Sequence, residues 1–273
     1  MTSLAAAISI DSRGPCALYI VSDSRITWRG LGGHWDVGQK TFASRTTPHI
    51  FGFCGNAAFP PAALRQVIEL LDMGVLDDCE SSEVAHARFI DIFNSNLSAA
   101  TNKFFDGFSI LHGTREGAGM KCKFRLWKTD YFHSTDKLYD QEVQIEQLRS
   151  CFIRIDGSGR SIVQDRFEMW NLSEFAGTTR AAMWSFCEAL SSGKDNASGG
   201  APQLVGLKRV GPSERLGMIW AGKRYVSGME VLESDNVDRL NWFNEAFERC
   251  SGKTGTRLEK ASIHSKGRNS SSI

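Results

Sequence analysis

The first ten residues, MTSLAAAISI, form an apolar run that begins after Thr2 and ends before Asp11. The run is too short to cross a membrane and no basic segment precedes it, so we expect neither a membrane span nor a secretory signal. A second apolar run occupies residues 16–22, after turn-forming residues at 11–15. Two such runs joined by a turn are typical of a buried β-hairpin, around which the rest of the chain is expected to fold.

Thr2 carries a hydroxyl group at the start of this hairpin. Because threonine is small, we expect the methionine in front of it to be removed, which would place a free α-amine on the same residue. The sequence begins only one residue earlier, so activation is expected to depend on this removal alone. An α-amine has an ordinary pKa of about 7.7–8.0 and can accept the hydroxyl proton near neutral pH. Thr2 is therefore a candidate N-terminal nucleophile.

Composition excludes several classes of protein. The 273 residues have no internal linker, which predicts a single domain over residues 1–250. A net charge of +1 gives no general attraction to nucleic acid or to a membrane surface, so neither is expected as a partner. Seven cysteines without a C-x-x-C pair and six histidines without zinc-binding spacing predict no metal or other cofactor. They also favour reduced thiols and a cytoplasmic location.

Hydrophobic periodicity predicts alternating blocks of strands and helices. Helices are expected at about 60–74, 82–104, 160–170, 178–190 and 235–250, with strands before and between the helix pairs. The order strands, helix pair, strands, helix pair, strands predicts an α+β fold, namely a four-layer αββα sandwich. Residues 251–273 are basic and rich in Ser and Gly, which predicts a disordered tail.

Polar and glycine-rich motifs separate these elements in a fixed order. They are Thr2, Ser22-Asp23-Ser24-Arg25, Gly38-Gln39-Lys40, Phe51-Gly52-Phe53-Cys54-Gly55, Gly157-Ser158-Gly159 and Asp195-Asn196-Ala197-Ser198-Gly199-Gly200. Each motif alone has an ordinary explanation, such as a surface lysine, a helix cap or a turn. As an ordered set over roughly residues 2–210, they resemble the β-type subunits of the proteasome family. Those subunits are N-terminal-nucleophile (Ntn) hydrolases and threonine proteases with the αββα fold.

The resemblance implies a role for each matching residue. Thr2 would be the nucleophile and its own amine the base. Lys40 would lie beside that amine and lower its pKa, so that more of the amine is neutral. Asp23 would pair with Lys40 and hold it in place.

The remaining matches would complete the catalytic centre. Ser158, Asp195 and Ser198 would orient the amine and a water molecule by hydrogen bonds. The backbone N–H of Gly52 would stabilise the oxyanion, a contribution of about 3–4 kcal/mol in enzymes where such a donor has been removed.

The same alignment places Ile26, Ile50 and Cys54 around a pocket for the substrate side chain. That pocket would be apolar and of moderate size. The alternative is that all three are ordinary core residues.

These matches together predict a threonine endopeptidase that forms an acyl-enzyme ester with a polypeptide substrate. The family further implies a homo-oligomeric ring and an ATPase unfoldase as partner. Two alternatives stay open: an Ntn amidase that cleaves a small non-peptide amide, and an inert proteasome-like ring protein that retains Met1. The long first hairpin and a C-terminal extension from about residue 211 depart from the family pattern and favour a divergent bacterial-type homologue.

Overall fold

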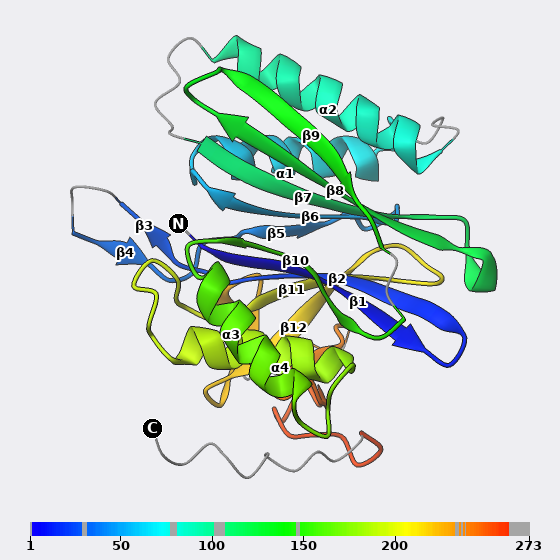
Figure 1. Cartoon of the computed structure of the whole chain (residues 1–273), viewed down its shortest axis with the longest axis vertical. Helices are drawn as coiled ribbons and strands as arrows, with labels where there is room; N and C mark the ends of the chain where they lie inside the picture. The colour runs from blue at the N-terminus through cyan, green and yellow to red at the C-terminus, as the bar shows by residue number, and fades with distance from the viewer. Residues whose placement is uncertain are drawn as a thin grey trace.

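The computed structural model describes residues 2–28, 32–76, 81–100, 107–145, 148–232, 235, 237 and 239–261. Within these residues the strands form two antiparallel-rich sheets and a short two-stranded ribbon (Figure 1). The larger sheet has nine strands: β1 (Ser3–Asp11), β2 (Gly14–Ser22), β10 (Cys151–Gly157), β11 (Gln203–Lys208), β12 (Glu214–Trp220), β13 (Lys223–Val226), β14 (Met229–Glu230), β15 (Trp242–Asn244) and β16 (Arg249–Cys250).

The smaller sheet contains five strands: β5 (Thr41–Ala43), β6 (His49–Gly55), β7 (Gly107–Glu116), β8 (Lys123–Phe132) and β9 (Lys137–Val143). The ribbon pairs β3 (Ile26–Thr27) with β4 (His34–Trp35). The helices are α1 (Phe59–Asp72), α2 (Ser82–Ala99), α3 (Arg160–Asn171) and α4 (Thr179–Ser191), with a 3₁₀ turn η1 (Gly119–Lys121) before β8. None of these helices combines the length and apolar character needed to cross a membrane.

Strand β1 lies inside the larger sheet between β10 and β2. Residues 3–9 are all buried, which explains why the sequence there is nearly continuously apolar instead of alternating. Leu4, Ala6 and Ile8 pack in the cluster shared with the smaller sheet. Ala5 and Ala7 pack in the cluster that contains α4. The hairpin predicted at residues 2–22 is confirmed.

Each sheet is covered by its own helix pair (Figure 1). Helices α1 and α2 pack on the smaller sheet through a cluster that includes Phe51, Phe53, Phe89 and Phe93. Helices α3 and α4 pack on the larger sheet through Val163, Met183 and Phe186, among others. The four helices predicted in these regions are confirmed, although residues 101–104 of the second lie outside the described residues.

The predicted fold class, the four-layer αββα sandwich of Ntn hydrolases, is wrong. The chain is a mostly antiparallel β-sheet protein, with 38% of its residues in strands, 25% in helices and four helices in the described part of the chain. The predicted helix at 235–250 is absent from the described part of that range, where β15 and β16 form instead. These strands and β12–β14 extend the larger sheet to nine strands.

The local reason for this difference lies in two residues of the C-terminal segment. Phe247 has a φ of +56°, in the left-handed region, so a right-handed helix cannot pass through it. Trp242 instead packs flat against Gly217 of β12, where a Cβ atom would lie 2.3 Å from the indole ring. The tail is also ordered further than predicted, because Leu258 N–H donates to the Arg249 carbonyl at 2.9 Å. Residues 262–273 lie outside the described residues.

A chain of three buried histidines runs beneath helix α2. His49 Nδ1 lies 2.9 Å from His112 Nε2, and His112 Nδ1 lies 2.7 Å from His86 Nδ1. His86 Nε2 in turn lies 2.9 Å from Asp140 Oδ2 on β9. Burial, together with a smaller effect of His86, lowers the pKa of His49 to about 4. Burial also holds the pKa of His112 well below its ordinary value.

These shifts predict that the protein loses stability in mild acid. The unfolded chain binds a proton at His49 near pH 6.5, whereas the folded chain binds it only near pH 4. The contribution of His49 is therefore fully present above pH 6.5 and is lost as the pH falls to 4, by about 3 kcal/mol. His112 adds a loss of the same sign. Urea unfolding at several pH values between 7.5 and 4 measures the effect.

The His49→Phe variant is the matched control for this prediction. Its free energy of unfolding should fall less steeply than that of the parent over the same pH interval. Parallel curves for the two proteins would contradict the assignment.

Candidate active site

Thr2 stands at the start of β1, where the neighbouring strand β10 ends. Its carbonyl oxygen lies against Gly157, and a Cβ atom on that glycine would approach the oxygen to 1.8 Å. Gly157 also has a φ of +92°, so only glycine fits this place without strain. The Thr2 residue is 1% exposed. The β1–β10 pairing thus fixes the backbone of the candidate nucleophile.

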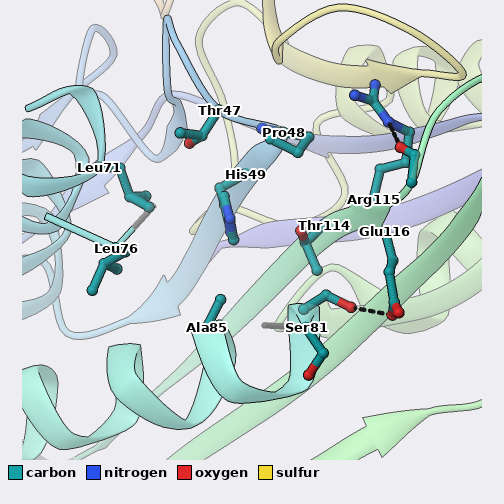
Figure 2. A pocket seen from close by; sticks show the side chains of 12 residues that line it. Thr47, Pro48, His49, Leu71, Leu76, Ser81, Ala85, Thr114, Arg115 and Glu116 are labelled. Carbon is teal, nitrogen blue, oxygen red and sulfur yellow. Dashed lines mark hydrogen bonds between the residues drawn. The ribbon is translucent and has the colours of Figure 1, made fainter. Parts of the chain in front are cut away.

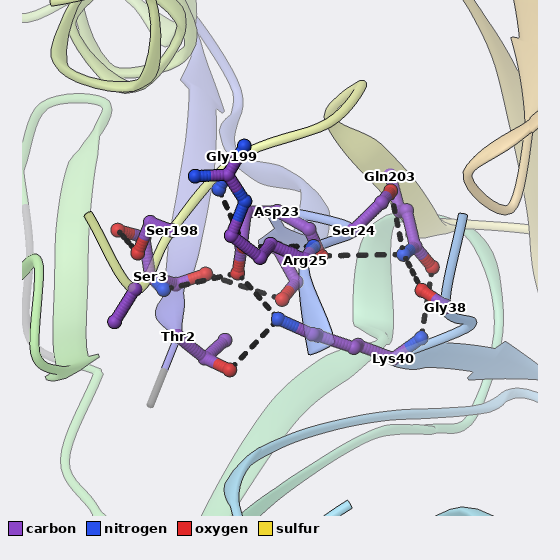
Figure 3. A network of polar contacts seen from close by, with 12 residues as sticks. Thr2, Ser3, Asp23, Ser24, Arg25, Gly38, Lys40, Ser198, Gly199 and Gln203 are labelled. Atoms are coloured by element: carbon purple, nitrogen blue, oxygen red, sulfur yellow. Dashed lines mark hydrogen bonds and ion pairs between the residues drawn. The ribbon is translucent and has the colours of Figure 1, made fainter. Parts of the chain in front are cut away.

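Lys40 brings a buried positive charge to the Thr2 hydroxyl. It precedes β5, and its Nζ donates to Thr2 Oγ1 and to Asp23 Oδ1, each at 2.8 Å (Figure 3). The lysine is 1% exposed and the aspartate 0%. Burial lowers the pKa of Lys40 below its ordinary value, and Asp23 opposes that shift. Lys40 is therefore not the surface lysine that the alternative explanation of its motif requires.

Asp23 holds Lys40 and also joins three separate segments. Besides Lys40, its carboxylate accepts hydrogen bonds from the backbone N–H groups of Ser3 at 3.1 Å, Arg25 at 3.0 Å and Gly199 at 2.9 Å. Burial raises the pKa of Asp23, and these donors oppose the increase. The Arg25 guanidinium pairs with Asp36 at 2.7 Å.

A second polar chain approaches from the other side of Ser3. Ser158 Oγ and Ser198 Oγ both donate to Asp195 Oδ2 at 2.7 Å. Ser198 Oγ also lies 2.9 Å from Ser3 Oγ. Because the single hydroxyl proton of Ser198 goes to Asp195, Ser3 must be the donor in that contact. Although burial alone would raise the pKa of Asp195, the hydrogen bonds from Ser158, Ser198 and the Ala197 backbone N–H contribute to a net lowering of the pKa.

The structure therefore brings six of the predicted site residues into two adjoining networks. Thr2, Asp23 and Lys40 form the first (Figure 3). Ser158, Asp195 and Ser198 form the second, which reaches the residue after Thr2. Ser158 is not the cap of α3, because that position belongs to Gly159. Asp195 does form a turn, since its Oδ1 accepts from Ala197 N–H at 3.0 Å.

Gln203 is a member of the site that the sequence motifs missed. It is fully buried on β11, and its Oε1 accepts from the Lys40 backbone N–H at 2.9 Å. Its Nε2 donates to Ser24 Oγ at 2.9 Å and to the Gly38 carbonyl at 2.6 Å. Gln203 thereby fixes the backbone of the segment that carries Lys40. The only signal in the sequence is a polar residue at the head of the apolar run Leu204–Leu207.

Gly52 does not occupy the predicted position of an oxyanion donor. It lies in the middle of β6, opposite Thr41 on one side and Leu111 on the other. Phe53 N–H donates to the Lys40 carbonyl on the β5 side, so the alternation of an antiparallel ladder turns the N–H of Gly52 toward β7. A Cβ atom there would lie 2.8 Å from Leu4. The glycine allows the two sheets to pack closely, which is its structural role.

The three predicted pocket residues do not lie together. Ile50 and Cys54 are four residues apart on β6, which separates them by about 13 Å in an extended strand. Ile50 and Cys54 both belong to the core cluster between the sheets, as the alternative of ordinary core residues expects. Ile26 lies on the ribbon, against the place where a Gly38 Cβ would be.

The surroundings of Cys54 are also more polar than an apolar pocket requires. Cys54 stands opposite Ser109, which stands opposite Asp130 on the next strand. Ser109 donates to Asp130, and Lys128 Nζ lies 2.5 Å from the same carboxylate. The predicted apolar pocket of Ile26, Ile50 and Cys54 is therefore wrong as a joint site.

Comparison with known proteins adds no further assignment. No known family model matches the chain, and no curated protein matches it either. Among the described residues, no group of three or more His, Cys, Asp or Glu side chains is arranged to hold a metal ion. The candidate active site rests on its own geometry.

The backbone arrangement at Thr2 predicts an unequal effect of two glycine substitutions. Gly157→Ala and Gly14→Ala both place a Cβ atom on a residue of positive φ, +92° and +104°. Only at position 157 does that atom collide, with the Thr2 carbonyl. We expect Gly14→Ala to cost about 1–3 kcal/mol of unfolding free energy and Gly157→Ala clearly more. Chemical denaturation measures both, and equal losses would mean that Thr2 is not held against β10.

Proposed function

We propose that this protein is a threonine-type peptidase that becomes active when the peptide bond between Met1 and Thr2 is cleaved. The observation that carries the proposal is the position of Lys40 Nζ, buried and 2.8 Å from both Thr2 Oγ1 and Asp23 Oδ1. A lysine and an aspartate taken out of water cost several kcal/mol each, which a purely structural contact repays poorly. A hydroxyl nucleophile beside them gives that arrangement a chemical use.

The first step of the reaction makes the hydroxyl reactive. Cleavage of the Met1–Thr2 bond turns the Thr2 nitrogen from an amide into a basic amine. This amine takes the proton from Oγ1, while the positive charge of Lys40 stabilises the negative charge that develops on the oxygen. Lys40 thus acts on the oxygen of the nucleophile directly, in addition to its predicted effect on the amine.

The second step transfers the acyl group of the substrate to Thr2. Oγ1 attacks the amide carbonyl, and the protonated α-amine returns its proton to the leaving nitrogen as the carbon–nitrogen bond breaks. The products of this step are the released amine and an ester on Thr2. A water molecule then gives a proton to the α-amine and attacks the ester, and the α-amine passes that proton to Oγ1 as the acid is released.

The serine–aspartate network orients the backbone next to the reacting threonine. Ser3 is bound to Ser198 through its side chain and to Asp23 through its backbone N–H, so both networks meet one residue from the reacting nitrogen. This double attachment orients the start of β1. In this role Ser158, Asp195 and Ser198 position the amine and do not themselves attack the substrate.

Substrate class, assembly and location follow from the resemblance to proteasome β-type subunits and form part of the same proposal. The substrate would be a polypeptide, the assembly a homo-oligomeric ring and the partner an ATPase that unfolds substrates. The six cysteines in the described residues are free thiols, which suits a cytoplasmic location.

The proposal predicts that hydrolysis depends on a free Thr2 amine and on Lys40. A chain produced with Thr2 as its first residue should cleave fluorogenic peptides, and Lys40→Met should lower kcat/KM by about 10²–10⁴-fold. Lys208→Met is the matched control, because Lys208 is exposed and pairs with Glu214 on the surface. It should retain the parent rate.

Two further variants keep this test decisive. Thr2→Ala should abolish hydrolysis while the protein still folds, with a lower unfolding midpoint because Lys40 Nζ loses a buried acceptor. Lys40→Arg should also abolish hydrolysis, because a guanidinium group differs in shape and hydration from an ammonium. Cleavage of small acyl amides but not peptides would favour the amidase alternative. Undiminished hydrolysis by Lys40→Met, or activity of a chain that keeps Met1, would refute the mechanism.

A further inference from the structure

A second site lies on the far side of the smaller sheet, under helix α2. A cavity of about 260 Å³ opens there between α2, the end of β7 and the start of β6 (Figure 2). None of its lining residues belongs to the networks around Thr2. Leu71, Leu76 and Ala85 provide apolar walls. This volume lies just below the usual range for ligands of drug size, about 300–1,000 Å³, so a small molecule is the fitting occupant.

His49 is the one histidine in a lining that also contains polar residues such as Thr47, Thr114 and Glu116. Figure 2 shows its ring above Ala85 of α2 and to the left of Thr114, and the residue is 8% exposed. Nδ1 is engaged by His112. For Nε2, the described part of the chain offers no hydrogen-bond partner. A ring nitrogen that faces a cavity from a largely buried residue can accept a hydrogen bond from a group outside the chain.

The histidine chain decides whether that nitrogen donates or accepts. Asp140 Oδ1 accepts from Thr129 Oγ1 at 2.8 Å, and Oδ2 faces His86 Nε2. A carboxylate can only accept, so the His86 proton must be on Nε2. In a neutral His86 the other nitrogen, Nδ1, carries no proton and therefore accepts from His112 Nδ1–H.

The same argument assigns the protons of His112 and of His49, which lines the cavity. Because the His112 proton is on Nδ1, its Nε2 accepts from His49 Nδ1–H. A neutral His49 therefore has no proton on Nε2, which leaves a lone pair directed at the cavity. The low pKa of His49 keeps this neutral form in place at physiological pH.

The charges around the cavity argue for an uncharged occupant. Glu116 stands at the exposed end of β7 and accepts from Ser82 Oγ at 2.9 Å, so an anion would meet both a carboxylate and a lone pair. Arg115 lies beside it, with its guanidinium bound to backbone carbonyls including that of Gly117 at 2.9 Å. The N-terminus of α2, at Ser81 and Ser82, adds further positive potential that opposes a cation.

We propose that this cavity binds a small uncharged molecule with an apolar body and one hydroxyl or azole N–H group, which donates to His49 Nε2. Asp140 sets the polarity of that nitrogen from a distance, through His86 and His112. The site is independent of Thr2, so its test does not depend on peptidase activity.

Phenol and toluene are the matched probes, because they share one shape and differ in the donor. Titrations of the full chain followed by NMR should show phenol in the cavity, with a shift of the His49 Nε2 resonance. His49→Phe should reduce the phenol-to-toluene affinity ratio by about tenfold, the contribution of one hydrogen bond. Ala85→Leu, which fills the cavity without touching the histidines, should weaken both probes.

Asp140→Asn gives the sharpest outcome, because it lies outside the cavity. With Thr129 still donating to the amide oxygen, the amide NH₂ would donate to His86 Nε2 and reverse every proton along the chain. His49 Nε2 would then carry a proton, phenol would lose its preference over toluene, and acetophenone, which can only accept, would gain affinity. Absence of phenol binding to the parent chain, binding unaffected by Ala85→Leu, or an unchanged probe preference in Asp140→Asn would overturn the proposal.

Discussion

The buried pair of Lys40 and Asp23 is the constraint to which the rest of the candidate active site responds. Two charges removed from water are costly, and their attraction offsets that cost only when the remaining donors and acceptors are also satisfied. Asp23 meets this condition with three backbone N–H groups drawn from β1, the loop after β2 and the loop before β11. One carboxylate thereby fixes the relative positions of three segments that are distant in sequence.

The buried Lys40 likewise requires that the backbone of its own segment be held in place by hydrogen bonds. Its backbone N–H is held by Gln203, which also binds the carbonyl of Gly38. The buried lysine side chain then has a fixed starting point from which it reaches the Thr2 hydroxyl. A pre-organised cation at a hydroxyl oxygen needs little reorganisation when negative charge develops there, which is the property a nucleophilic site requires.

The sequence predicts those parts of the molecule that local chemistry determines. The first hairpin, the helix pairs and the polar turns at Asp23, Ser158 and Asp195 have signals within a few residues, and the structure places them as expected. Three predictions were wrong: the oxyanion role of Gly52, the pocket role of Ile50 and the helix at 235–250. These roles depend on strand register and on packing partners such as Leu111 and Trp242. The fold class failed with them, since the number of strands in a sheet is set by pairing over long distances.

The histidine chain is a second feature that the sequence could not predict. His112 lies 63 residues from His49 and 26 residues from His86, which is no spacing typical of a site. The pairing of β6 with β7 beneath α2 brings the three together. Gln203 was missed for the same reason. Both cases are polar groups inside an apolar layer, and their geometry is determined by the partners that the fold brings to them.

The central claim is that Thr2 is a nucleophile with its own amine as the base. The most direct measurement is the intact mass of the purified protein before and after treatment with an electrophile that reacts with the hydroxyl and the amine of an N-terminal threonine. A chain that begins at Thr2 and gains one adduct, mapped to that residue, is the predicted result. A chain that begins at Thr2 and gains no adduct would contradict the claim.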